Sequence, residues 1–112
     1  MTETRDIESW HAHVYFDAAT VAKARALCEA ARDRFGVVMG RVHEKEVWPH
    51  PMRSCQLAIR KKDMAEVLSW LALNRDGLIV FAHPETGDEL ADHAEHAVWM
   101  GGYLPLKLET FR

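Results

Sequence analysis

Apolar and polar residues alternate near the start of the chain, and this pattern predicts a strand with one buried face. Within residues 10–16 the apolar positions are Trp10, Ala12, Val14 and Phe16. The positions between them are His11, His13 and Tyr15. A helical period follows, with an apolar stripe formed by Val21, Ala24, Leu27, Cys28, Ala31 and Phe35. Asp17 is placed to cap this helix and Gly36 to end it.

The rest of the chain predicts three more strands and a second helix. The strands fall at residues 37–43, 54–60 and 77–83, and the helix at residues 61–74. The order strand, helix, strand, strand, helix, strand is typical of the ferredoxin-like α+β fold, an antiparallel sheet with both helices on one face. After His83 we expect a turn, a short helix over residues 90–102 and an extended tail to Arg112.

Length and composition indicate one globular domain over residues 1–112. Lys and Arg total 14 against 17 for Asp and Glu, so charge gives no reason to expect nucleic acid as a partner. The first ten residues lack the apolar run of a signal peptide, and no segment has the length of a membrane helix, so we expect a cytoplasmic protein. Cys28 and Cys55 lie among apolar residues and are expected to be buried, reduced thiols.

Seven histidines in so short a chain are the unusual feature of the composition. In the predicted fold the start of the first strand lies beside the end of the fourth, so His11 and His83 become neighbours. The helices cover the apolar face, which leaves His11, His13 and Tyr15 on the uncovered face. Histidines at i and i+2 on one face can converge on a metal ion, with His83 as a third ligand. The alternative is a histidine pair that meets water or a dimer partner, and spacing alone favours this alternative.

The remaining histidines are open to two interpretations each. His50 lies in the proline-bounded loop "WPHPM" and is either a catalytic group on that loop or part of a surface turn. His93 and His96 share a face of the predicted last helix, where they form either a metal pair or a solvated surface. Tyr15 could hydrogen-bond a phenolic substrate or serve a dimer interface. Exposed aromatic residues on a small sheet favour association, so we expect a homodimer.

Four motifs, "HAHVYF", "PHPM", "HPETGDELADH" and "VWMGG", occur in an order that resembles the DOPA 4,5-dioxygenase family over about residues 7–108. The resemblance implies extradiol cleavage of a small catechol by dioxygen, with non-haem Fe(II) as the expected cofactor and zinc as an alternative occupant in purified protein. It implies metal ligands at His11, His13 and His83. It implies catalytic roles for His50 and His93, one of the two exchanging protons with the catechol. Tyr15, on the same strand face as the ligands, is a further catalytic candidate.

The sequence does not single out a carboxylate for the metal site. The candidates after His83 are Glu85, Asp88, Glu89 and Asp92. A second hypothesis is a non-catalytic homodimeric module that binds an aromatic ligand or a protein partner and holds a structural or adventitious metal. Coordination separates the two hypotheses, because a closed four-ligand site indicates structure and an open site indicates catalysis.

Overall fold

The computed structural model describes residues 7–111. Residues 1–6, on which most of the signal-peptide expectation rests, and residue 112 lie outside the described residues. The strands are β1 (Ser9–Phe16), β2 (Val38–His43), β3 (Arg53–Arg60), β4 (Val80–Glu85) and β5 (Val98–Met100). The α-helices are α1 (Val21–Phe35), α2 (Met64–Asn74) and α3 (Glu89–His93), and short 3-10 turns span Lys61–Asp63 and Leu108–Phe111.

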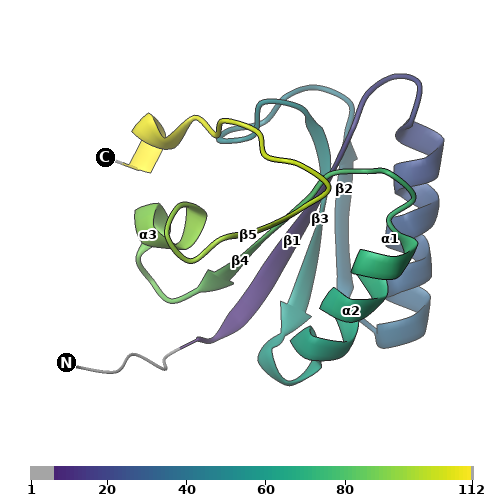
Figure 1. Ribbon diagram of the computed structural model, residues 1–112, viewed down its shortest axis with the longest axis horizontal. Coiled ribbons are helices and arrows are strands. Elements are labelled where there is room, and N and C mark those ends of the chain that lie inside the picture. Colours follow the sequence, from purple (N-terminus) through teal and green to yellow (C-terminus); the bar gives the residue numbers. More distant parts are fainter. Residues whose placement is uncertain (1–6, 112) are drawn as a thin grey trace.

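The predicted ferredoxin-like α+β fold is confirmed. The antiparallel sheet has the order β2-β3-β1-β4-β5, with β1 at its centre, and α1 and α2 cover one face (Figure 1). Ala12, Val14 and Phe16 of β1 are buried against these helices, together with Leu57 and Ile59 of β3, and Trp10 packs against this core partly buried. Both cysteines are buried, free thiols in this core, as predicted. No helix within residues 7–111 is long and apolar enough to cross a membrane.

The ends of α1 follow the sequence in part. Gly36 ends the helix as predicted, with φ 72° and a backbone N–H that donates to the Arg32 carbonyl at 2.9 Å. Asp17 does not cap the helix itself. Its carboxylate accepts from the backbone N–H groups of Ala19 and Thr20 at 2.9 and 3.0 Å, and Thr20 occupies the cap position. Asp17 therefore shapes the turn that leads into α1.

The predicted last helix is shorter than expected. It ends at His93, and Val98–Met100 instead forms the edge strand β5, which pairs antiparallel with β4 from Val80 to Ala82. A β-branched residue followed by an aromatic one suits a strand, and β4 would otherwise present an open edge. The prediction of a helix through residue 102 was therefore wrong, and the sheet has a fifth strand.

The second face of the sheet is covered, contrary to expectation. α3 and the C-terminal segment lie on the side of the sheet opposite α1 and α2 (Figure 1). Beneath them Tyr15 is only 1% exposed, and His13 is also buried. The sequence expectation failed because the chain after β4 returns across this face without a regular hydrophobic period. His13 consequently lies in the interior rather than on a wet surface, whereas His11 stays partly exposed.

Candidate metal centre

The central strands bring three histidines together. In the β1–β4 register His11 stands directly opposite His83, as the topology predicted, and His13 stands opposite Phe81. One ring nitrogen from each of His11, His13 and His83 lies within 4.8 Å of the others. The Nε2 atoms of His13 and His83 are 3.1 Å apart. The alternation of side chains along two paired strands is thus enough to bring three imidazole rings close together.

This spacing fits a metal ion. Imidazole nitrogens bind Zn²⁺ at about 2.0–2.1 Å, so two ligands at adjacent coordination positions are separated by about 2.9–3.4 Å. The separation of 3.1 Å between the Nε2 atoms of His13 and His83 falls in that range. Among the residues described, this group offers three histidine nitrogens and no fourth ligand. A metal ion bound to it would therefore keep open coordination positions.

The imidazoles are also in the protonation state that a metal requires. Burial, followed by the nearby His93, lowers the pKa of His83 to about 4. Burial and the neighbouring His50 hold the pKa of His13 well below its ordinary value. Burial lowers the pKa of His11 as well. Neutral imidazoles keep a lone pair for a metal at neutral pH, whereas imidazolium does not.

Hydrogen bonds at Nδ1 fix the tautomers of three rings. His83 Nδ1 donates to the Pro84 carbonyl at 3.1 Å and His93 Nδ1 to the Glu89 carbonyl at 2.8 Å. His11 Nδ1 donates to the Glu85 carboxylate at 2.7 Å. Because a carbonyl oxygen only accepts, the neutral rings carry their proton on Nδ1 and their lone pair on Nε2. Metal-bound histidines in proteins are held in this way.

His13 completes the cluster by a different contact. With the His83 lone pair on Nε2, the 3.1 Å contact requires His13 to donate its Nε2 proton to His83 when no ion is present. An ion bound to both nitrogens would require the neutral His13 ring to carry its proton on Nδ1 instead. Metal binding is therefore coupled to a change of tautomer at His13.

The other three predicted residues adjoin these rings. The His50 ring lies 4.2 Å from the His13 ring, and the His93 ring lies 4.0 Å from the His83 ring. The Tyr15 hydroxyl is 2.7 Å from His50 Nδ1. Burial, followed by His93, lowers the pKa of His50 to about 4, and burial raises the pKa of Tyr15. The structure thus gathers all six residues into one cluster.

The four candidate carboxylates have separate partners. Glu85 contacts the Nδ1 side of His11, so it supports that ring from outside the cluster. Asp92 accepts from both the backbone N–H and the hydroxyl of Thr86, at 2.8 and 2.6 Å. Asp88 caps α3, and Glu89 is more than half exposed. None of the four joins the three-histidine group found within residues 7–111.

His93 and His96 do not form the pair that a longer helix would have produced. Because α3 ends at His93, His96 lies beyond it and its Nδ1 donates to Asp92 Oδ1 at 3.2 Å. His96 thereby helps to hold the turn between β4 and α3. Asp92 is buried, but these hydrogen bonds from Thr86 and His96 outweigh the burial and lower the pKa of its carboxyl group.

An aromatic wall beside the histidines was not anticipated from the sequence. Phe81 is fully buried, with its ring 4.6 Å from Trp99 and 5.7 Å from His13. Trp99 in turn stacks on Tyr15 at 6.1 Å. The alternation in "VFAH" placed Phe81 on the histidine face, and the edge strand β5 placed Trp99 there too. Phe81 and Trp99 exclude water from one side of the cluster.

The C-terminal segment closes another side. The Phe111 ring lies 4.5 Å from His93, and the Lys107 backbone N–H donates to the Pro49 carbonyl at 2.9 Å. The Lys107 ammonium also pairs with Glu46 at 3.1 Å. The segment therefore connects α3 with the loop that carries His50.

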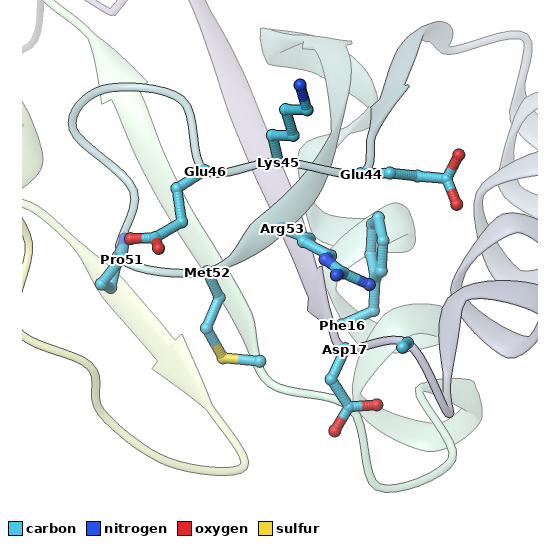
Figure 2. Close-up of a pocket in the computed structure, with 9 residues that line it drawn as sticks. Phe16, Asp17, Glu44, Lys45, Glu46, Pro51, Met52 and Arg53 are labelled. Atoms are coloured by element: carbon cyan, nitrogen blue, oxygen red, sulfur yellow. The ribbon is translucent and has the colours of Figure 1, made fainter.

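A surface cavity of about 470 Å³ lies elsewhere, between the end of β1 and the loop from residue 44 to residue 53 (Figure 2). Its lining includes Arg53 and Phe16 but none of the histidines. This cavity is therefore separate from the histidine cluster in its lining residues.

The fold and the histidine cluster define a small ferredoxin-like protein with a site suited to a divalent metal. The profile of the Dopa 4,5-dioxygenase family matches residues 10–110, and the chain belongs to this family. It is 33% identical to a DOPA 4,5-dioxygenase of Amanita muscaria over 92% of this chain and 49% of that protein. It is also 33% identical to an uncharacterized 21.2 kDa protein of Botryotinia fuckeliana, over 80% of this chain and 54% of that protein.

A solved structure has the same fold over nearly the whole chain. The crystal structure of a "putative dioxygenase" from Nostoc punctiforme superposes with a TM-score of 0.93 at 42% sequence identity. It covers 97% of this chain and 95% of the Nostoc chain. The two fungal relatives are longer, and this chain spans about half their length.

Proposed function

We propose that this protein is an extradiol ring-cleaving dioxygenase that acts on a small catechol. The observation that carries the proposal is the convergence of His11, His13 and His83, with one nitrogen from each within 4.8 Å of the others. Membership of the Dopa 4,5-dioxygenase family supports the same class of reaction. The expected metal is Fe(II), held by these three histidines.

When bound, Fe(II) would bring the catecholate and dioxygen together and pass electron density between them. The protein residues supply the remaining requirements. Glu85 and the carbonyls of Pro84 and Glu89 orient imidazole rings through Nδ1. Trp99, which is partly exposed next to the fully buried Phe81, provides an aromatic surface of the kind that accommodates a flat ring.

Proton transfer falls to the histidines outside the three ligands. The His93 ring donates its Nδ1 proton to the Glu89 carbonyl, which leaves Nε2 as the nitrogen that would accept a proton from a catechol hydroxyl. The ring lies 4.0 Å from His83, so such a proton would be taken next to the metal ligands. His93 is thus suited to act as the base.

The proposal is tested by oxygen consumption with protein loaded anaerobically with Fe(II). L-DOPA and a panel of related catechols are offered, and the yellow semialdehyde product is followed by absorbance. His13→Ala is expected to reduce both iron content and oxygen uptake at least about 100-fold, because it removes one of three ligands. His43→Gln, a histidine of β2 outside the cluster, is the control and is expected to keep both.

Iron binding without uptake of oxygen for any catechol would favour the alternative function, a binding module with a structural metal. Full activity in His13→Ala would contradict the proposed ligand set. The predicted homodimer and cytoplasmic location stay predictions. The aromatic residues available for association are Trp48 and Tyr103, both largely exposed, and size-exclusion chromatography with light scattering measures the oligomeric state.

A further inference from the structure

Tyr15 and His50 form a buried polar pair next to the histidine ligands. Tyr15 belongs to β1, and His50 lies in the loop between β2 and β3. The exposed fractions of the two residues are 1% and 5%. Their contact, from the Tyr15 hydroxyl to His50 Nδ1, is 2.7 Å long. This distance is that of a well-formed hydrogen bond, and its direction decides what His50 offers to the site.

The direction follows from counting partners. If His50 donated from Nδ1, the phenolic hydrogen of Tyr15 would need another acceptor, and residues 7–111 provide none. A buried hydroxyl hydrogen without a partner costs about 1–3 kcal/mol. If Tyr15 donates instead, the phenolic hydrogen and the His50 Nδ1 lone pair are both satisfied. The neutral His50 ring must then carry its proton on Nε2.

The opposite nitrogen of His50 is left free. Among residues 7–111, no group forms a hydrogen bond with His50 Nε2. In the same residues, every fully enclosed side-chain nitrogen has a hydrogen-bond partner. Nε2 therefore borders space that a ligand or water can reach. The His50 backbone N–H donates to the Val47 carbonyl at 2.8 Å, which holds the loop beneath the ring. The ring lies 4.2 Å from His13, so the free N–H is beside the proposed ligands.

His50 thus differs from three of the histidines around it, those whose ring proton is on Nδ1. His11, His83 and His93 each bind an acceptor through Nδ1 and present a lone pair at Nε2. His50 binds a donor through Nδ1 and presents an N–H at Nε2. The partner at Nδ1 thus determines what Nε2 presents. An oxygen acceptor at Nδ1 leaves a lone pair at Nε2 in three rings, and a hydroxyl donor at Nδ1 leaves an N–H at Nε2 in His50.

We propose that Tyr15 is a positioning residue that fixes His50 in the Nε2–H tautomer, so that His50 is the hydrogen-bond donor of the site and not a metal ligand. Its consequence for catalysis rests on the proposed function: His50 would donate to a substrate oxygen that gains negative charge. Because the Tyr15 hydroxyl gives its hydrogen to His50, it would meet a phenolic substrate only as an acceptor. His50 and His93 then have different roles, donor and base.

The tautomer can be measured directly, without turnover. Protein labelled with ¹⁵N in its histidines is loaded with diamagnetic Zn²⁺, and long-range ¹H–¹⁵N correlation spectra distinguish protonated, free and metal-bound ring nitrogens. The His50 signals are identified by their loss in His50→Gln. We expect an unprotonated Nδ1 and a protonated Nε2 in the parent protein. In Tyr15→Phe, the Nδ1 signal should shift as its hydrogen bond is lost and tautomer exchange begins.

Tyr103→Phe is the matched control, because it removes the same hydroxyl from a tyrosine that is 70% exposed. It should leave the His50 signals unchanged, and the His83 and His93 signals should stay in place in both variants if the fold is intact. Spectra that show the His50 proton on Nδ1 would overturn the proposal. Spectra that show zinc bound to a His50 ring nitrogen would overturn it too. An unchanged Nδ1 signal in Tyr15→Phe would overturn it as well.

Activity provides a second arm that separates this inference from the proposed function. With the iron-loaded protein and an accepted catechol, Tyr15→Phe should lower kcat about tenfold or more with little change in KM. His50→Gln, whose amide nitrogen can replace Nε2–H, should retain more activity than His50→Asn. Equal losses in the two would contradict the donor role. If no catechol is consumed, the proposed function fails, while the spectra still decide the tautomer.

Discussion

Acid should unfold the metal-free protein at unusually mild pH, because its buried histidines are neutral. Burial lowers the folded-state pKa of His50 and of His83 to about 4, whereas the unfolded chain titrates near 6.5. Between these values the unfolded state binds more protons than the folded state, so a falling pH favours unfolding. The stability contributed by the neutral rings is complete above pH 6.5 and is lost progressively down to about pH 4.

The magnitude follows from the two pKa values. Lowering the pH from 7.5 to 5 reduces the free energy of unfolding by about 2 kcal/mol through His50 and by about 2 kcal/mol through His83. The pair together therefore reduces it by about 4 kcal/mol. His13 acts in the same direction, because its pKa is also lowered by burial and by His50. Glu85 acts in the opposite direction. Burial and the nearby Glu89 raise its pKa, so its protonation at lower pH slightly stabilises the folded state. A typical domain has about 5–15 kcal/mol of stability in total.

Urea unfolding of chelator-treated protein at pH 7.5 and pH 5 measures this loss. We expect the midpoint to fall steeply at pH 5 while the slope with urea stays constant. His50→Gln removes one titrating ring, so its loss between the two pH values should be about 2 kcal/mol smaller than that of the parent. Equal midpoints at the two pH values would refute the reasoning, because they would mean that the buried rings do not titrate abnormally.

Three further substitutions test individual contacts. Glu85→Gln removes the charge that holds the His11 Nδ1 proton, and it should weaken Zn²⁺ binding about tenfold in competition with a chromophoric chelator. Phe81→Ala empties a fully buried ring position and should cost about 3–5 kcal/mol in urea unfolding. Gly36→Ala meets no atom within 4 Å, so its expected cost of about 1 kcal/mol in thermal unfolding comes from the positive φ alone.

The elements with a clear hydrophobic period could be predicted from the sequence. The alternation of β1 and the apolar stripe of α1 identified the faces that pack against each other in the core, and the ferredoxin-like order then placed His11 beside His83. Topology and alternation together were therefore enough to bring the three candidate ligands together. The family motifs added His50 and His93, which no strand period would have connected to the cluster.

The cover over the second sheet face could not be predicted. β5 has three residues, too few to show a strand period, and they follow a histidine-rich segment whose composition also suits a helix. The segment that ends at Phe111 is held by single contacts such as that from Lys107 to Pro49, which leave no pattern in the sequence. The carbonyls of Pro84 and Glu89 that fix two tautomers are backbone atoms, so residue types do not reveal them.

This cover changes the chemistry of the histidines as well as their exposure. On an open face, as the sequence suggested, His13 and His83 would titrate near 6.5, and a large share of the rings would be protonated slightly below neutral pH. Beneath α3, β5 and the C-terminal segment, desolvation keeps both rings neutral and their nitrogens free for a metal. The same burial produces the acid sensitivity predicted above. Readiness to bind metal and instability in acid therefore have one physical origin in this protein.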